Sequence, residues 1–217
     1  AEHFLYFSSA EVYGKLSDTN LITESMTGQI DPLDIRSCYS ESKRMGETLC
    51  KAYCEQYQVP ATCLRIFHTY GPTLDYKHDQ RVFSEFVKSV IEDNQIIMKS
   101  SGEAKRAFCY ALDLVSACLT VLFHGCPGEA YNMANDDCFI SIKELAQEII
   151  AAFPERSIQL KLQQRELTSN YIENKTTTYI NVSTDKLRKL GWKPTISVRE
   201  GFRRTITLLE NEIKQQR

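Results

Sequence analysis

The segment HFLYFSSAEVYG, residues 3–14, and the two elements that follow it decide the fold class of this chain. Residues 3–8 form a continuous, mostly apolar run, which is typical of a parallel strand buried on both faces. Residues 40–57 then predict a helix with Met45, Leu49 and Tyr53 at intervals of four, and ATCLRIF, residues 61–67, predicts a second short strand. Strand, long helix and strand with short connections indicate a βαβ unit of a doubly wound sheet.

The remaining sequence predicts further helices and shorter strands. Helices are expected over residues 82–91, 112–123, 142–153, 186–190 and 198–214, and strands over 95–99, 106–110, 130–133 and 158–162. Residues 167–178 are polar and irregular. We therefore expect an α/β protein: the C-terminal part of a Rossmann-like doubly wound parallel sheet, then a smaller mixed α/β lobe. The expected division is 1–75 and 76–217, with some later elements crossing back.

The composition is that of an ordinary globular protein. Hydrophobic residues make up 42% of the 217 residues, and 26 basic against 28 acidic residues give a net charge of −2. No basic field therefore favours nucleic acid or an anionic membrane, and no apolar run approaches the ~20 residues that span a bilayer. The eight cysteines include no CxxC pair, and six lie in apolar or helical stretches. We expect reduced thiols, no metal site and, without a signal peptide, a cytoplasmic protein.

Tyr39 and Lys43 form the first pattern that could carry chemistry. A spacing of four places both side chains on one face of a helix, about 5–6 Å apart at Cβ. An ammonium group beside a phenol favours the tyrosinate form, and this would make Tyr39 a general base. The spacing alone is a weak signal, because many exposed helix faces carry it by chance.

The second pattern is SSAEVYG, residues 8–14, at the end of the first strand. Side chains just beyond the carboxyl ends of parallel strands point into the crevice where open α/β sheets bind ligands. A hydroxyl at Ser9 could share a proton with a substrate hydroxyl. A turn with local serine hydrogen bonds would give the same residues.

The two patterns occur in a specific order. A strand ends in SS-x-E-VYG, Y-x-x-x-K follows about thirty residues later on a helix, and the next strand leads into RIFHTYGP. This order resembles the extended short-chain dehydrogenase/reductase family, in particular its NAD-dependent nucleotide-sugar epimerases, dehydratases and decarboxylases. The likeness extends over nearly the whole chain and includes RAFCY at 106–110, EAYNM at 129–133 and LGWKP at 190–194.

The resemblance implies a role for five residues. Tyr39 matches the catalytic base that takes a proton while a sugar hydroxyl gives hydride to NAD, and Lys43 matches the lysine that binds the nicotinamide ribose. Ser9 matches the residue that hydrogen-bonds the reacting hydroxyl. Arg106 matches the arginine that binds the nucleotide diphosphate, a task suited to a bidentate guanidinium group. Arg81 lies where several relatives place another nucleotide contact.

Three positions bear on which activity to expect. His68 stands where relatives commonly carry an asparagine that touches substrate, and it could bind substrate or be structural. Sugar 4,6-dehydratases carry an acidic Asp where this chain has Ala10, which argues against that reaction. Glu11 matches the acidic residue of UDP-glucuronate decarboxylases and could take part in catalysis.

The family's glycine-rich segment has no counterpart here. The nine glycines include no G-x-x-G-x-x-G pattern, the motif that cradles the cofactor pyrophosphate at a helix N-terminus. We therefore expect the chain to be part of a longer enzyme and inactive alone. A non-catalytic nucleotide-sugar-binding or scaffold protein is one alternative. Another chemistry, built on Cys109, His68 and His78, is a second alternative that no ligand spacing supports.

The resemblance implies a reaction through a 4-keto sugar but leaves its outcome open. Epimerisation of a UDP-sugar and decarboxylation of UDP-glucuronate begin with the same oxidation at carbon 4. The family commonly forms homodimers through a four-helix bundle that includes the Y-x-x-x-K helix. Met45, Leu49 and Tyr53 could supply the apolar stripe for such a bundle, or could face the sheet.

Overall fold

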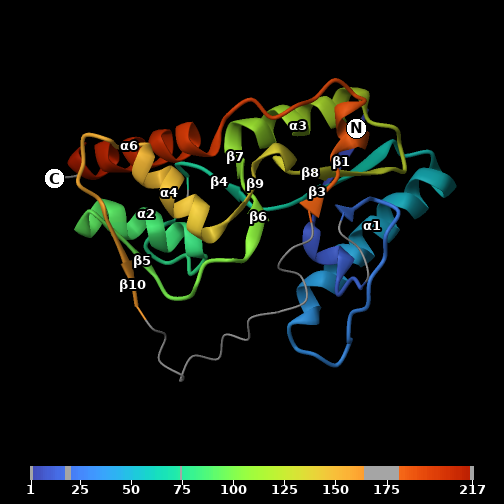
Figure 1. Ribbon diagram of the computed structural model, residues 1–217. Helices are drawn as coiled ribbons and strands as arrows, with labels where there is room; N and C mark the ends of the chain where they lie inside the picture. Colours follow the sequence, from blue (N-terminus) through green and yellow to red (C-terminus); the bar gives the residue numbers. More distant parts are fainter. Residues whose placement is uncertain (1, 18–20, 74, 164–180, 216–217) are drawn as a thin grey trace.

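A three-stranded parallel sheet lies at the centre of one of two groups of elements in the computed structural model (Figure 1). The structure describes residues 2–17, 21–73, 75–163 and 181–215. The sheet contains β1 (Phe4–Ser9), β3 (Ala61–Ile66) and β8 (Ala130–Met133), in the order β1-β3-β8. Ser9 pairs with Ile66, and Ile66 pairs with Met133, so the three strands end level at one carboxyl edge. The expected α/β class with a parallel sheet is confirmed.

Two helices cover opposite faces of this sheet. Adjacent side chains of a strand point to opposite faces, and Leu5 packs with buried residues of α3 (Ala111–His124), while Tyr6 packs beside Cys50 of α1 (Ser37–Tyr57). Figure 1 shows α1 and α3 on either side of the strands. Each element of the predicted βαβ unit is therefore present, and β8 returns to it from far along the chain.

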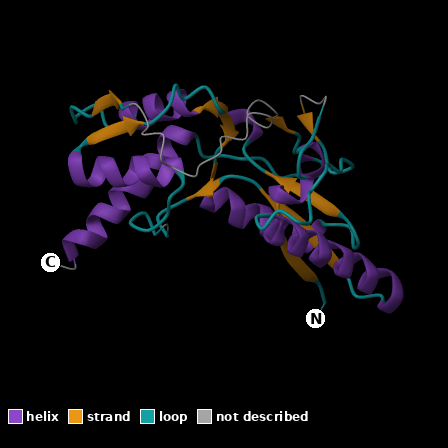
Figure 2. Cartoon of the chain, turned by 90° about the horizontal axis from the view of Figure 1, so that it is seen from below, coloured by secondary structure: helices purple, strands orange, loops and turns teal. Residues whose placement is uncertain are grey.

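A second group of elements surrounds its own apolar core. It contains α2 (Val82–Asp93), α4 (Ile142–Ala151), α6 (Val198–Gln215) and the parallel strands β5 (Gln95–Met98) and β10 (Gln159–Leu162). Val87, Leu145, Ile149, Phe202 and Ile206 are fully buried there. Their helical spacing explains why three short amphipathic helices assemble on one core. In Figure 2, the two ends of the chain lie far apart, with C at the left and N at the lower right.

Short elements connect the two groups. Three strand pairs contain only two or three residues per strand: β4 (Thr69–Tyr70) with β7 (Cys109–Tyr110), β6 (Lys105–Ala107) with β9 (Phe139–Ser141), and β2 (Leu21–Ile22) with β11 (Asn181–Val182). Three short helices complete the fold: η1 (Ala10–Tyr13), η2 (Asp136–Cys138) and α5 (Asp185–Arg188).

The structure corrects the sequence predictions in the connecting region. The single strand predicted over 106–110 is divided at the buried Phe108, because β6 pairs antiparallel with β9 whereas β7 pairs parallel with β4. Strands β2, β4, β9 and β11 were not predicted, since two or three residues are too few for an alternating pattern. Helix α1 begins at Ser37, three residues before the predicted start at Ser40. The irregular segment predicted over 167–178 lies outside the described residues.

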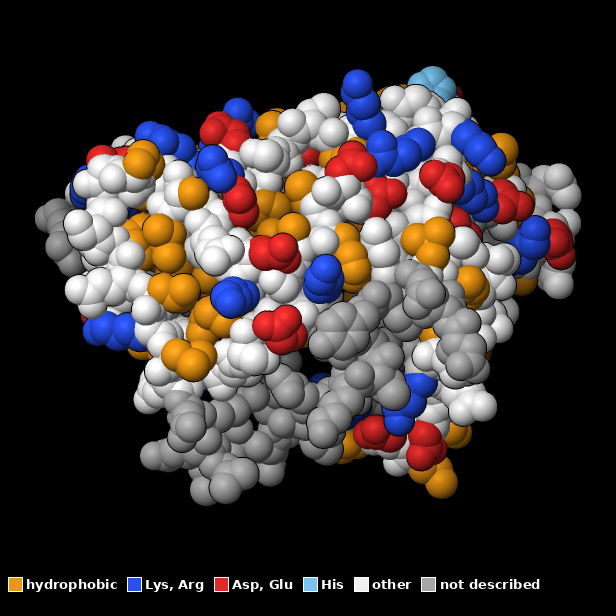
Figure 3. All heavy atoms as spheres, viewed as in Figure 1, with side chains coloured by type: hydrophobic (Ala, Val, Ile, Leu, Met, Phe, Trp, Pro, Cys, Tyr) orange, Lys and Arg blue, Asp and Glu red, His pale blue; other side chains and the backbone are white. Residues whose placement is uncertain are grey.

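The surface carries no charge pattern of a single sign on the face drawn in Figure 3, where basic and acidic side chains alternate over the coloured part. Within the described ranges, no helix combines the length and the apolar character needed to cross a membrane. All eight cysteines are free thiols in the structure.

Candidate active site

Ser9 lies at the carboxyl end of β1, where the chain turns into η1. Its hydroxyl caps this short helix by accepting a hydrogen bond from the Glu11 amide at 3.3 Å. The turn ends at Gly14, which has a φ of +59°. A residue with a side chain would be strained at this angle, whereas glycine adopts it readily. The Glu11 carboxylate is exposed. The predicted turn therefore holds Ser9 at the edge of the sheet and directs Glu11 outward.

Lys43 joins α1 to the end of the same strand. Its ammonium group donates a hydrogen bond to the Phe7 carbonyl oxygen at 2.7 Å and lies 5.7 Å from the centre of the Tyr39 ring. Half of the Tyr39 surface is exposed, so the residue is open to solvent. The structure thus places Lys43 and Tyr39 of α1 next to β1 at Phe7, two residues before Ser9 in the same strand.

A buried ion pair joins α1 to β3 next to the carboxyl edge of the sheet. Arg65 of β3 donates to both carboxylate oxygens of Glu47 on α1, at 2.8 and 2.6 Å, and the two side chains are only 12% and 15% exposed. Glu47 also accepts a hydrogen bond from the Ser8 hydroxyl at 2.5 Å. The ion pair therefore fixes α1 against β3, and the Ser8 hydrogen bond fixes α1 against β1, one helical turn after the Lys43–Phe7 contact.

Tyr13 of η1 and Asn132 of β8 continue the hydrogen-bond network of Arg65. The Tyr13 hydroxyl accepts a hydrogen bond from Arg65 at 2.9 Å and donates one to the Asn132 amide oxygen at 2.5 Å. Burial raises the pKa of Tyr13 to about 12 even though Arg65 lowers it, so this phenol stays protonated. Arg44 adds hydrogen bonds to the Val12 and Gly28 carbonyls, at 2.8 and 2.7 Å.

Sequence reasoning missed this network. Two signals could have revealed it: an arginine inside the apolar strand ATCLRIF, and Glu47 placed four residues after Lys43. A charge in the middle of a buried strand requires a partner, because an unpaired buried charge is costly.

His68, Arg81 and Arg106 form a second group beyond the end of β3. His68 is exposed to solvent, but nearby protein atoms still desolvate its ring in part, and this desolvation, with the positive charges of Arg106 and Arg81, lowers its pKa to about 4. His68 is therefore a neutral imidazole at physiological pH. Arg106 donates to the Lys105 carbonyl at 2.7 Å. The guanidinium groups of Arg81 and Arg106 therefore both lie near the uncharged His68 ring.

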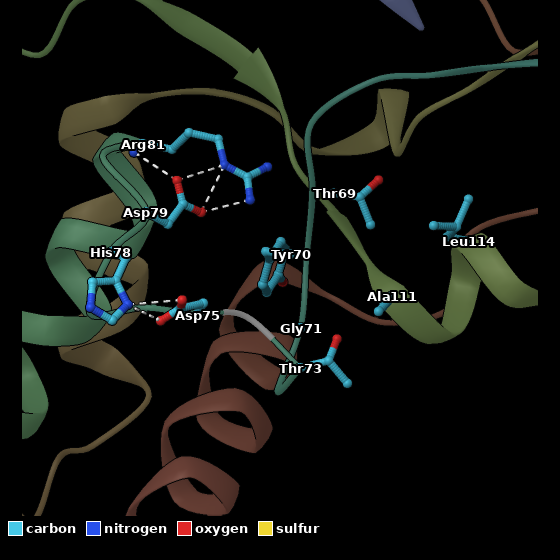
Figure 4. A pocket seen from close by; sticks show the side chains of 10 residues that line it. All are labelled: Thr69, Tyr70, Gly71, Thr73, Asp75, His78, Asp79, Arg81, Ala111 and Leu114. Carbon is cyan, nitrogen blue, oxygen red and sulfur yellow. Dashed lines mark hydrogen bonds and ion pairs between the residues drawn. The ribbon is translucent and has the colours of Figure 1, made fainter. Parts of the chain in front are cut away.

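Arg81 also lines a hollow of about 530 Å³, shown in Figure 4. Arg81 is held by Asp79 at 2.6 Å, and hydrogen bonds from Arg81 and Ser84 lower the pKa of Asp79 to about 2 although partial burial opposes this. The sticks in Figure 4 place this pair, and the His78–Asp75 pair at 2.9 Å, across the hollow from a wall of small and apolar side chains. That wall is formed by Thr69, Gly71, Ala111 and Leu114.

The alternative chemistry based on Cys109, His68 and His78 gains no support. Burial raises the pKa of the Cys109 thiol, which is fully enclosed, so it is poorly suited to act as a nucleophile. His78 is paired with Asp75 on the surface. Within the part of the chain that the structure describes, no three histidine, cysteine or acidic side chains are grouped as metal ligands.

Comparison with known proteins decides the family. A family model described as the NAD dependent epimerase/dehydratase family matches residues 1–134. The chain belongs to this family. The resemblance inferred from the motifs is thereby confirmed, and so are membership of an enzyme family and dependence of that family on NAD.

Relatives of the epimerase/dehydratase family match at similar levels but carry different activities. Human dTDP-D-glucose 4,6-dehydratase is 30% identical over 207 residues, which cover 94% of this chain and 55% of that protein. UDP-glucuronic acid decarboxylase 1 of Xenopus tropicalis is 30% identical over 214 residues, which cover 98% of this chain and 48% of that protein. The chain therefore spans about half the length of these relatives, and overall identity does not choose between the two reactions.

Solved structures of the epimerase/dehydratase type share the fold. UDP-N-acetylglucosamine 4-epimerase from Methanobrevibacter ruminantium M1 superposes with a TM-score of 0.79 at 20% identity, covering 97% of this chain and 64% of that one. dTDP-glucose 4,6-dehydratase from Bacillus anthracis, solved with NAD, gives a TM-score of 0.72 at 22% identity, with 97% and 62% covered.

The residues present suit one end of the family's cofactor. Lys43 offers an ammonium group that is partly open and held in place by a backbone carbonyl, next to the half-exposed Tyr39 phenol. Donors of this kind can bind ribose hydroxyls. The described residues therefore suit binding of a ribose, whereas the 217-residue sequence offers no glycine-rich turn for the pyrophosphate.

Proposed function

We propose that this chain carries the sugar-oxidising site of an NAD-dependent nucleotide-sugar epimerase/dehydratase that works through a 4-keto intermediate. The observation that carries the proposal is the position of the Lys43 ammonium group. It donates a hydrogen bond to the carbonyl of Phe7, which precedes Ser9 by two residues in β1, and it lies beside the Tyr39 ring. Tyr39 as base, Lys43 as cation and Ser9 as hydroxyl would then act near the carboxyl edge of a parallel sheet, where such sheets bind ligands.

Each of the three residues has a distinct task in the proposed reaction. Tyr39 takes the proton from the 4-hydroxyl of the sugar, and the Lys43 ammonium group stabilises the negative charge that Tyr39 carries beforehand. Ser9 hydrogen-bonds the reacting hydroxyl and orients it toward Tyr39. The hydride from sugar carbon 4 would pass to the cofactor NAD, which would supply the oxidant when bound. Lys43 is also the residue that would hold the nicotinamide ribose.

His68, Arg81 and Arg106 are proposed to bind the substrate. Two guanidinium groups can neutralise a nucleotide diphosphate, and a bidentate fork matches phosphate oxygens. His68 stays neutral between them, so it can exchange a hydrogen bond with a sugar or ribose hydroxyl without adding charge. The proposed partner is a UDP-sugar or another nucleotide-sugar, and residues 76–217 would form most of the lobe that binds it. Residues 1–75 would then be the C-terminal portion of the NAD-binding domain.

Epimerisation of a UDP-sugar is our first assignment, and decarboxylation of UDP-glucuronate is the second. Ala10 lacks the carboxyl group that a 4,6-dehydratase uses as an acid. Glu11 favours the decarboxylase, since its carboxylate is exposed beside Ser9 and is free to act at the sugar. Incubation of the catalytically complete protein with UDP-glucose, UDP-galactose and UDP-glucuronate separates the two, because only decarboxylation releases CO₂.

A non-catalytic nucleotide-sugar-binding role is the alternative of another class. It predicts binding of a UDP-sugar without turnover in a protein that also contains a glycine-rich NAD site. Retention of Ser9, Tyr39 and Lys43 in one geometry favours catalysis instead. For the 217-residue chain alone we expect no turnover and no NAD-dependent rise in the unfolding temperature. A clear rise would show that the chain binds NAD without a glycine-rich segment.

A homodimer and a cytoplasmic location are also proposed. The stripe of Met45, Leu49 and Tyr53 is 50–59% exposed, so it does not face the sheet. An exposed apolar stripe on the helix that bears Tyr39 is suited to pack against a second copy.

A further inference from the structure

A second tyrosine ring contacts the Lys43 ammonium group. Its nitrogen lies 5.2 Å from the centre of the Tyr6 ring, 5.7 Å from the centre of the Tyr39 ring and 2.7 Å from the Phe7 carbonyl oxygen. A cation within about 6 Å of an aromatic ring centre is attracted by the negative face of the ring. Lys43 therefore has three partners, and two of them, Tyr6 and Phe7, belong to β1.

The Tyr6 ring is fixed in place by a glycine of α1. A Cβ atom at Gly46 would lie 2.2 Å from the Cζ and hydroxyl atoms of Tyr6, so the ring occupies the space that a side chain would fill. The ring also packs beside the buried Cys50 and Cys63. Tyr6 cannot move away from Lys43 without disturbing the contact between β1 and α1.

Tyr6 is unsuited to be the proton acceptor, although it lies as close to Lys43 as Tyr39 does. It is partly buried within β1, and burial, followed by the neighbouring Cys50 and Cys63, raises its pKa above the ordinary value for tyrosine. Tyr6 therefore keeps its proton and offers a neutral ring face. Tyr39, which is half exposed, is the tyrosine that a sugar can reach.

We propose that Tyr6 is a positioning residue for Lys43: its ring and the Phe7 carbonyl hold the ammonium group beside Tyr39. Lysine carries a strongly hydrated ammonium group on a flexible four-carbon stem, so a single hydrogen bond leaves the ammonium group free to turn toward solvent. The ring of Tyr6 limits that motion. The catalytic meaning of this position rests on the function proposed above, whereas the position itself does not.

Chemical labelling of Lys43 tests the position directly. The 217-residue chain is treated with limiting acetic anhydride, and acetylation of Lys43 is measured by mass spectrometry relative to the exposed Lys51 on the same helix. Tyr6→Phe keeps the ring and should label Lys43 at the wild-type rate. Tyr6→Met keeps an apolar side chain without a ring face and should label Lys43 about two- to fivefold faster.

A fluorinated series separates the charge–ring attraction from packing. Phenylalanine with one, two or three ring fluorines at position 6 keeps nearly the same volume while the negative ring face is progressively weakened. We expect Lys43 labelling to rise with each fluorine. Equal labelling from unfluorinated to trifluorinated phenylalanine would overturn the proposal, even if Tyr6→Met failed to fold.

The labelling needs neither NAD nor a sugar, so its result is independent of the proposed function. In the catalytically complete protein, Tyr6→Phe should retain kcat, whereas Tyr6→Met should lower kcat more than it raises KM. A stepwise labelling series in a protein without any turnover would leave the position of Lys43 established and the proposed reaction wrong.

Discussion

Arg65 of β3 and Glu47 of α1, the helix that bears Tyr39, are joined by two hydrogen bonds of 2.8 and 2.6 Å. Both side chains are largely buried, and Glu47 also holds Ser8, the neighbour of Ser9. The ion pair therefore connects three elements directly under the proposed catalytic residues. Its geometry explains how a site assembled from β1 and α1 keeps its shape.

Removal of one partner of this pair should destabilise the fold strongly. Arg65→Met leaves the buried Glu47 carboxylate without its cation, and we expect a loss of about 3 kcal/mol in the free energy of unfolding. The double variant Arg65→Met/Glu47→Met removes both charges and should recover much of that loss. Urea unfolding of the three proteins measures both effects. A single variant as stable as the wild type would show that the pair contributes nothing.

Gly46 should tolerate no side chain while Tyr6 is present. Alanine normally stabilises a helix by about 1 kcal/mol relative to glycine. Here the added methyl group would collide with the Tyr6 ring, and we expect Gly46→Ala to lower stability by about 1–3 kcal/mol instead. In a Tyr6→Leu background the same substitution should cost much less. Thermal unfolding of the four proteins in this cycle checks the contact, and equal effects in both backgrounds would contradict it.

His68 should make stability depend on pH in the acidic range. Its pKa is lowered from 6.5 to about 4 in the folded protein. Between these pH values the unfolded chain binds a proton at His68 that the folded chain does not. The contribution of His68 to the free energy of unfolding is therefore complete near neutral pH and declines as pH falls from about 6.5 toward 4. His68→Asn removes this contribution.

Unfolding of both proteins at pH 7 and pH 5 measures the effect. The wild type should lose more stability over this interval than His68→Asn does, since all other groups are shared. An identical loss in the two proteins would mean that His68 titrates normally in the folded state.

The apolar stripe of α1 should govern self-association. Leu49 is 50% exposed between Met45 and Tyr53, and a buried glutamate in its place would be disfavoured in any helix-to-helix contact. We expect Leu49→Glu to be monomeric by light scattering under conditions where the wild type is a dimer. Gln58→Glu, an exposed change of the same charge at the C-terminal end of α1 and half a helical turn away from Leu49, is the matched control. A wild-type chain that is monomeric at every concentration would refute the proposed interface.

The long, periodic elements of this fold were predictable from the sequence, and the short ones were not. The apolar run before Ser9 and the four-residue spacing in α1 each span enough residues to show a pattern. Strands such as Thr69–Tyr70 form only because β7 lies beside them, so their cause is tertiary. The division of 106–110 has the same origin: Phe108 enters the core and the strands on either side find different partners.

The site shows the same contrast. Ser9, Tyr39 and Lys43 were visible because motif order places them at one edge of a parallel sheet. Tyr6 was hidden, because a tyrosine in an apolar strand looks like any core residue. Its contact with Lys43 depends on the face of β1 to which Tyr6 points and on the space left by Gly46. Tyr6 and Gly46 lie forty positions apart in the sequence and come together only in the fold.

The most direct test of the account is turnover of UDP-sugars by the catalytically complete protein carrying Tyr39→Phe. Loss of the general base should reduce kcat by about two to four orders of magnitude while NAD binding and the unfolding temperature stay unchanged. Tyr53→Phe, an exposed tyrosine on the same helix, should keep full activity. Wild-type turnover in the Tyr39→Phe protein would contradict the assignment of Tyr39 as the base, and with it the proposed reaction.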